Sequence, residues 1–172
     1  MLNPYINNHE YQPTKDLIDD LTIEYIQAMG VDVAYIPREL VKLDKIFGED
    51  VLSRFTDAYT IEMYWDSAQD WGGPNRFFSK FGIQDQRQVE FIVSKTRFNE
   101  VVTTGNSAIY KPRVGDVVLS TTYDTIAFNI VWVEEYSLQR RNLNQQYAWM
   151  LVCEPLTYSH EEHDTGIEAF DS

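Results

Sequence analysis

Two segments near the middle of the chain constrain its fold most, because both alternate large apolar residues with mostly polar ones. The segments are residues 59–66 and 88–95, and their apolar positions are Ile61, Met63, Trp65, Val89, Phe91 and Val93. A period of two is typical of a β-strand with one buried face. A slip of one residue would expose the whole apolar set, so the register is strongly specified. We therefore expect two strands whose apolar residues face one interior.

Four further segments have the composition and punctuation of strands. They are residues 31–36, 117–120, 125–135 and 147–158. Pro37 stops the first of these, and a turn that contains proline and glycine precedes the second. Six strands joined by turns predict a mainly β domain. Because closure removes exposed strand edges, we expect residues 59–158 to form a small closed or nearly closed β-barrel with long loops.

One convincing helix, at residues 15–29, precedes all six strands. Its apolar residues recur at helical spacing, namely Leu17, Ile18, Leu21, Tyr25 and Met29. Thr14 suits the N-cap, and Gly30 suits the C-terminal cap. The predicted fold class is therefore mainly β with an N-terminal helix, an α+β arrangement. A short helical turn is expected over residues 97–102, and a loop with short helical turns over 39–55.

The chain length of 172 residues suits one domain with a sizeable core. We assign residues 1–13 to an extended N-terminal arm, 14–158 to a single β-barrel-type domain that starts with the helix, and 159–172 to an acidic C-terminal tail. Residues 67–86 and 137–146 are expected to be long connections between strands. The chain has 11 tyrosines and 4 tryptophans, more than a small core needs. Some of these aromatic residues are therefore expected at protein interfaces.

The charge balance argues against a protein that grips nucleic acid. The chain has 14 basic and 27 acidic side chains, a formal net charge of −13. Phosphate binding requires clustered lysine and arginine, because phosphate contacts dominate affinity. As a whole the chain should repel DNA, although the same acidity could simply keep it soluble. The one basic pair, Arg140 and Arg141, is a candidate DNA-channel contact, with a solvated connection as the simpler interpretation.

The single cysteine, Cys153, excludes an intramolecular disulfide and indicates a reducing compartment. It lies in an apolar run, where a buried and inert thiol is expected. The N-terminus has no charged region followed by an apolar one, and no apolar run approaches the ~20 residues of a membrane helix. We therefore expect no export signal and no membrane association, and a soluble, intracellular protein where it is made.

No motif of the sequence favours catalysis, a cofactor or a metal. His160 and His163 are three residues apart, whereas the zincin motif places two histidines four apart on a helix. Gly72 and Gly73 are followed by Pro74, which has no amide proton to offer a phosphate. No Gly-x-Ser-x-Gly elbow occurs for a serine nucleophile. We predict that the protein is not an enzyme, that it has no cofactor, and that its tail is solvated rather than metal-binding.

The loop from Trp71 to Gly82 gives a sharper hypothesis, a contact with another subunit or partner. Its candidate interface residues are Trp71, Gly72, Gly73, Pro74, Arg76, Phe77 and Phe78. Aromatic residues and arginine are favoured anchors at interfaces. The alternative is that the phenylalanines fold back as a lid on their own barrel. We expect the loop and the helix at 15–29 to lie at contacts, so that Phe77→Ala or Phe78→Ala weakens assembly and leaves the monomer folded.

Several motifs follow one another in an order and at spacings typical of one known family. They are Asp32–Arg38, Phe47–Asp50, Ile61–Tyr64, Gly72–Pro74, Ser94–Phe98, Pro112–Asp116, Cys153–Leu156 and Asp164–Ile167. In this order the chain closely resembles the neck protein of T-even-type contractile-tailed bacteriophages. Members of that family tend to extend beyond the last motif, whereas this sequence ends at Ser172. A role carried by such an extension is therefore not transferred to this chain.

The resemblance implies a structural virion protein that forms a ring, a homohexamer, in the phage neck. Such a ring closes the head, retains DNA and docks the tail. Its implied partners are further copies of itself, a portal-side adaptor protein and a tail terminator protein, while duplex DNA passes without tight or sequence-specific binding. The protein would be made in the host cytoplasm. The alternative is a small β-barrel binding module or an uncharacterised phage enzyme, which a strictly monomeric protein that binds a small molecule would favour.

Overall fold

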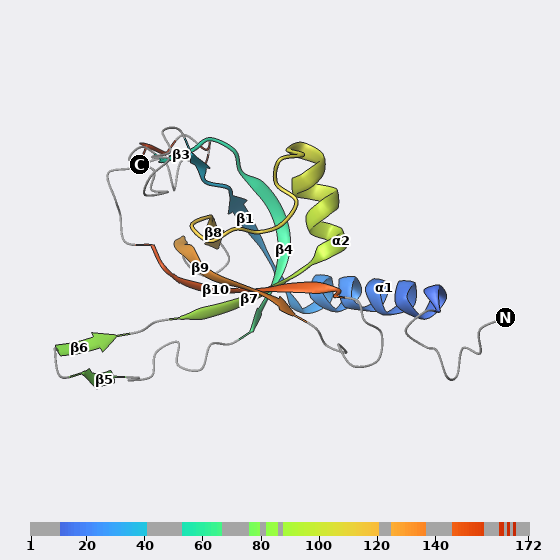
Figure 1. Cartoon of the computed structure of the whole chain (residues 1–172), viewed down its shortest axis with the longest axis horizontal. Coiled ribbons are helices and arrows are strands. Elements are labelled where there is room, and N and C mark those ends of the chain that lie inside the picture. The colour runs from blue at the N-terminus through green and yellow to red at the C-terminus, as the bar shows by residue number, and fades with distance from the viewer. Residues whose placement is uncertain are drawn as a thin grey trace, which may run out of the picture.

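The computed structural model of the chain describes residues 11–40, 53–66, 76–79, 82–85, 88–120, 125–136, 146–156, 162–163, 165 and 167. In this part of the chain one N-terminal helix is followed mostly by strands, and a closed barrel stands at the centre of the molecule (Figure 1). This arrangement confirms the α+β fold class that the sequence predicts. No helix in the described ranges is long and apolar enough to cross a membrane.

Six antiparallel strands close the barrel. In their order around it they are β1 (Val31–Ile36), β4 (Tyr59–Asp66), β7 (Val89–Ser94), β10 (Ala148–Pro155), β9 (Ile126–Tyr136) and β8 (Val117–Ser120), which pairs with β1 again. All six strands predicted from the sequence therefore take part. The barrel begins earlier than the predicted range of 59–158, because β1 pairs with β4 on one side and with β8 on the other. Without β1 these two strands would be open edges.

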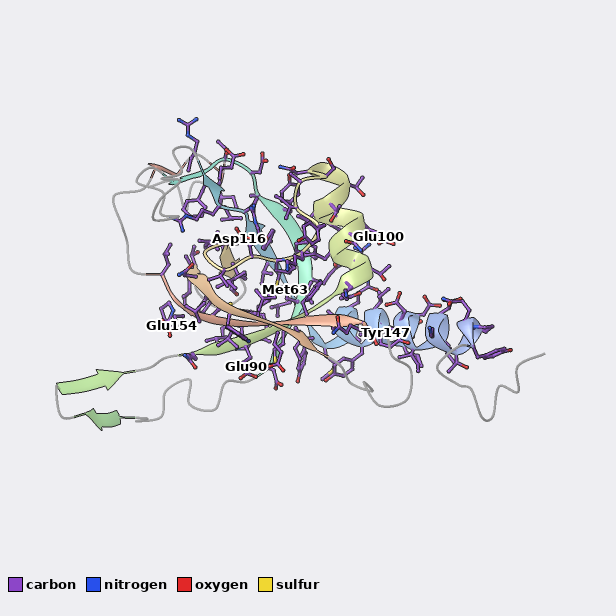
Figure 2. All side chains as sticks on the ribbon, in the orientation of Figure 1. Met63, Glu90, Glu100, Asp116, Tyr147 and Glu154 are labelled. Carbon is purple, nitrogen blue, oxygen red and sulfur yellow. The ribbon has the colours of Figure 1, made fainter. Side chains whose placement is uncertain are left out.

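The barrel interior holds the side chains that the alternation predicted. Five of the six predicted positions are at most 1% exposed, and Trp65 packs against them. Aromatic rings fill one part of this core. The ring centroids of Phe91 and Phe128 lie 5.6 Å apart, and those of Trp65 and Phe91 lie 5.3 Å apart, distances at which aromatic rings attract each other. Figure 2 shows Met63 within the barrel.

A second, smaller sheet lies against the outside of the barrel. Its strands, in order, are β11 (Glu162–His163), β3 (Ser53–Phe55) and β2 (Glu39–Leu40). Phe55 is 2% exposed and forms a buried cluster with apolar residues of β1 and β8, among them Ile36 and Leu119. The expected loop with helical turns over 39–55 is therefore wrong at β2 and β3. Strands of two and three residues are too short to show a period of two.

The helix α1 (Gln12–Met29) begins three residues earlier than predicted. Pro13 lies in its first turn, where a missing amide proton costs no hydrogen bond. Thr14 is therefore inside the helix and is not its N-cap. Gly30 caps the end of α1 as predicted, and its N–H donates to the Ile26 carbonyl oxygen at 2.7 Å. A Cβ at this position would lie 2.4 Å from that oxygen and 2.7 Å from a carbonyl oxygen of β4, so only glycine fits.

A short helical segment follows β7 and contributes to the core. It consists of α2 (Lys95–Phe98) and a π-helical turn, η2 (Asn99–Thr103). This confirms the helical turn predicted over residues 97–102. Phe98 and Val102 are both buried among the side chains that the strands enclose. The barrel core therefore includes side chains from this helical segment as well as from the strands.

The long connection expected over residues 67–86 contains a hairpin that the sequence pattern did not show. Its strands are β5 (Arg76–Ser79) and β6 (Gly82–Asp85), which pair antiparallel with each other and with no other described strand. Figure 1 shows this β5–β6 hairpin standing away from the barrel, at the end of the molecule opposite α1.

Candidate interaction surface

The barrel-facing side of α1 is narrow and only partly apolar. Ile26 is 3% exposed and packs with Ile92 of β7 and Ala148 of β10. Thr22 is also buried, and its hydroxyl donates to the Ile18 carbonyl oxygen at 2.7 Å. These contacts hold α1 against the outer face of the barrel, over β4, β7 and β10.

A second flank of α1, beside the barrel-facing side, leaves its apolar residues in water. Leu17, Leu21, Tyr25 and Met29 are between 51% and 62% exposed. Residues four apart are neighbours on one helix face, so these side chains form a continuous row, which we call the apolar stripe. Exposed apolar patches mark interaction sites, because covering them removes apolar area from water at roughly 25 cal/mol per Å². The apolar stripe is therefore the first candidate for a contact with another chain.

A groove runs between the apolar stripe and the barrel. Its volume is about 360 Å³, and it is lined by Thr22, Tyr25, Ile26, Tyr64, Asp66, Ile92 and Ala148. The rings of Tyr25 and Tyr64 lie 5.3 Å apart between centroids, at 48° to each other. A hydrogen bond with Tyr25 raises the pKa of Tyr64. Because its phenol stays neutral at physiological pH, this wall of the groove combines an aromatic face with an uncharged hydroxyl.

Carboxylates border the groove. Asp66 lines it from the end of β4, and its direct partner across the sheet is Glu90 of β7. Like charges opposite each other on neighbouring strands repel. Neither carboxylate belongs to an ion pair within the described residues, and Figure 2 shows Glu90 on the outside of the barrel. The groove is therefore suited to an apolar segment that brings positive charge.

Trp132 of β9 is a separate exposed apolar residue. It is 61% exposed and pairs with Val152 of β10 across the sheet. A β-bulge causes its outward position, because Val131 is an extra residue that β10 does not match. Ile130, just before the bulge, faces the interior, so unbroken alternation would have placed Trp132 inside.

Where β1 pairs with β8, two motifs of the sequence meet at one carboxylate. Asp116 accepts a hydrogen bond from the hydroxyl of Tyr35. It also accepts from the backbone N–H groups of Arg38, at 2.8 Å, and of Arg113, at 3.0 Å. The Arg113 guanidinium in turn donates to the Arg38 carbonyl oxygen at 3.0 Å. We call these four residues the clasp, because they join the end of β1 to the turn before β8.

The carboxylate at the centre of the clasp is buried, and the role of the clasp is structural. Asp116 is 1% exposed, and burial raises its pKa, an effect that the hydrogen bonds from Tyr35 and from the backbone oppose. Burial, followed by the charge of Asp116, raises the pKa of Tyr35 far above its ordinary value, so the phenol stays a donor. Gly115, in the adjoining turn, has a φ of 92°, a left-handed conformation that glycine adopts without strain. A buried carboxylate with three donors around it holds strands together.

The structure describes only some of the predicted interface residues. Outside the described residues lie Trp71, Gly72, Gly73, Pro74, Arg140 and Arg141. Within β5 lie Arg76, Phe77 and Phe78, for which the structure describes the backbone pairing. Their contact role stays a prediction. Tyr64, Asp66 and Trp132 were not singled out from the sequence. Alternation along a strand predicts whether a side chain faces the barrel interior or the outside, but not which outward side chains lie next to a helix.

The described residues give no support for a metal centre. None of them form a group of three or more His, Cys, Asp or Glu side chains that could hold a metal ion. His160 lies outside the described residues, and His163 is in β11, where the backbone is extended. Cys153 is buried as expected, and burial raises the pKa of its thiol.

One family of known proteins matches nearly the whole chain. Its family model, of the T4 neck protein type and described as virus neck protein, matches residues 1–168. The match confirms the resemblance carried by the ordered motifs, of which Asp32–Arg38 and Pro112–Asp116 are the two that the clasp joins. The chain therefore belongs to the neck protein family of T4-type phages, which places it in the virion neck between head and tail.

Proposed function

We propose that this chain forms a homomeric ring, a hexamer as the family resemblance implies, that closes the head, retains DNA and docks the tail. The observation that carries the proposal is the apolar stripe of α1, which stays in water although the barrel core beneath it is complete. A neck protein works among head and tail proteins, so an uncovered apolar face fits a contact within the assembly.

A ring subunit needs separate surfaces for its neighbours and for the layers above and below it. The chain presents contact elements in different directions, because α1 and the β5–β6 hairpin lie at opposite ends of the molecule (Figure 1). The exposed Trp132 on β9 adds a further apolar site away from the stripe. The layers that such a ring would meet are the portal-side adaptor protein and the tail terminator protein.

DNA would pass through the ring without tight binding. A hexamer would carry 6 × −13 = −78 formal charges. Arg97, one of the described cations, is already paired with Glu62 and Glu100. In each copy 27 acidic side chains outnumber the 14 basic ones that could hold phosphate, so a duplex can slide, since each neutralised phosphate adds affinity that must later be lost.

The ring is tested by sedimentation and negative-stain imaging of the purified protein, with a charge placed in the apolar stripe. Leu21→Glu should keep the barrel folded, because Leu21 is 52% exposed, but should shift the protein from rings to monomers. The matched control is Tyr110→Glu, at a residue that is 66% exposed and outside α1, and it should leave the rings intact. A wild-type protein that stays monomeric at every concentration, with no such ring in disrupted virions, would contradict the proposal.

A duplex-binding assay at low salt tests the sliding conduit, since screening of charges is weakest there. We expect no measurable binding by the assembled ring. The competing role is a brake, in which Arg140 and Arg141 line the channel and hold the phosphates. Submicromolar binding that is lost in the double variant Arg140→Ala/Arg141→Ala would refute the conduit and support the brake.

A further inference from the structure

The β5–β6 hairpin pairs with nothing else in the described chain. Its two strands of four residues each are hydrogen-bonded only to one another. A two-stranded hairpin is at best marginally stable in water and needs further strands or a packing surface. Its sequence is rich in apolar residues, and Phe78 of β5 pairs directly with Ile83 of β6. The hairpin therefore needs a surface on which to pack.

The hairpin and α1 have opposite charge. The hairpin, residues 76–85, carries two basic residues and one acidic one, 2 − 1 = +1, in a chain with a net charge of −13. Residues 12–29, which form α1, carry one lysine and four carboxylates, 1 − 4 = −3. Asp66 and Glu90 add to the negative charge beside the groove. Opposite charges across a contact steer association and fix its register.

The two elements also lie at opposite ends of the molecule, with the barrel between them (Figure 1). A contact between two different patches on successive copies is a head-to-tail contact, and it generates a closed ring when the rotation between copies closes. A patch that met itself would instead give a two-fold dimer. The placement of the hairpin and the apolar stripe thus suits a ring.

We propose that the β5–β6 hairpin of one copy docks on the apolar stripe and the groove of the next copy. This contact rests on the ring proposed above and names the two surfaces that would build it. Phe77 and Phe78 of the hairpin supply aromatic anchors, the residue type that dominates binding energy at interfaces. Arg76 brings positive charge to the carboxylates of Asp66 and Glu90.

Crosslinking between two single-residue cysteine variants tests this contact directly. Leu21→Cys places a thiol in the apolar stripe, and Phe78→Cys places one in the hairpin, while the native Cys153 is buried. Mild oxidation of an equimolar mixture should give a disulfide-linked dimer, and each variant alone should give none. Tyr110→Cys mixed with Phe78→Cys is the matched control, since Tyr110 is exposed outside both surfaces, and it should stay uncrosslinked.

Charge exchange gives a second readout. Arg76→Glu should weaken ring assembly by about tenfold or more, because it sets a carboxylate against the carboxylates beside the groove. Adding Asp66→Arg in the same chain should restore most of that loss. Lys111→Glu, at an exposed residue outside both surfaces, carries the same charge change and should leave assembly unaltered.

The outcomes separate the docking contact from the ring itself. Rings that form as readily in Phe78→Ala and Arg76→Glu as in the wild type would overturn the docking and leave the ring standing. Leu21→Cys that crosslinks to itself would reveal a two-fold contact through α1 and would also overturn it. So would a crosslink, within assembled virions, from the hairpin to a different neck protein. A wild-type protein that never forms rings would remove both proposals.

Discussion

The barrel interior and the apolar stripe of α1 have equally regular apolar patterns, yet the chain buries only one of them. In the interior, Met63 and Phe91 belong to patterns with a period of two and are 0% exposed. On α1, Leu17, Leu21 and Tyr25 recur every fourth residue, and each keeps more than half of its surface in water. A regular apolar pattern therefore shows which face of an element is apolar. The pattern does not show whether the residues that bury this apolar face belong to the same chain or to another one.

The contrast is sharper because the barrel-facing side of α1 is itself partly polar. Thr22 is buried beside Ile26, and Asp19 accepts a hydrogen bond from the hydroxyl of Thr96 in α2 at 2.7 Å. A surface helix ordinarily turns its apolar stripe toward the core of its own domain. On α1 the row of Leu17, Leu21 and Tyr25 instead stays in water, which supports a contact of the stripe with another chain.

The largest effect should come from removing an aromatic ring in the interior. Phe91→Ala should lower the free energy of unfolding by about 3–5 kcal/mol, because the ring is buried between those of Trp65 and Phe128. Leu21→Ala, the matched change in the apolar stripe, should lower it by less than ~0.5 kcal/mol. Urea titration at concentrations where the protein is monomeric measures both. Equal losses would break the comparison, since they would make the stripe part of the core.

The next largest effect should come from the clasp, where polar contacts hold the strand that closes the barrel. Tyr35→Phe removes the hydrogen bond to Asp116 and keeps the ring, whose centroid lies 5.2 Å from that of Phe98. A hydrogen bond to a charged group contributes about 1.5–3 kcal/mol, and we expect a loss in that range. Tyr110→Phe, at an exposed tyrosine, should cost almost nothing by the same urea titration. If the two losses are alike, the backbone donors alone hold Asp116.

A somewhat smaller effect is expected at the turn beside the clasp. Gly115→Ala places a Cβ at a φ of 92°, where a residue with a side chain is strained by about 1–2 kcal/mol. That Cβ would also lie 3.2 Å from the Arg38 guanidinium. Val114→Ala, at the neighbouring residue that is 62% exposed, is the control and should change the midpoint of unfolding very little. A midpoint that is the same in both variants would show that the turn relaxes without disturbing the clasp.

The barrel was predictable because its signal is local. Each of the alternating segments around Met63 and Phe91 shows its period within one strand, and closure follows from the cost of open edges. The clasp was not predictable in the same way. Tyr35 and Asp116 are 81 residues apart, and only the pairing of β1 with β8 brings them together. Both motifs were visible in the sequence, but their meeting depends on topology.

The candidate interaction surface was predictable only in part, for two physical reasons. The helix was expected at a contact, yet the exposure of Leu21 depends on how α1 is rotated on the barrel, and Ile26 decides that rotation from the other face. Trp132 faces outward because a single extra residue, Val131, interrupts the alternation of β9. A bulge leaves no clear mark in the local composition, so counting by two beyond Ile130 places the tryptophan on the wrong side.

The smallest effect should come from an ion pair on the outside of the barrel, between β4 and α2. Arg97 donates to Glu62 Oε1 at 3.1 Å and also pairs with Glu100 at 2.7 Å. Burial alone would raise the pKa of Glu62, but a backbone hydrogen bond and the bond and charge of Arg97 outweigh it, so the pKa is lowered. The pair therefore stabilises the fold above the unfolded pKa of ~4.3, and its contribution is lost as the pH falls through the folded value.

Glu62→Gln should accordingly cost ~0.2–1 kcal/mol at neutral pH, the range of partly exposed ion pairs, and much less in strong acid. Urea titrations of the wild type and the variant across this pH range, at low and high salt, measure the difference. Glu100→Gln, at a carboxylate that is 54% exposed, is the control and should show a smaller pH dependence. If Glu62→Gln costs as much in acid as at neutral pH, then Glu62 acts through packing rather than charge. In that case the outer face of β4 at Glu62 would belong to the packed part of this chain, and less of the outer surface would be left for contacts with other chains.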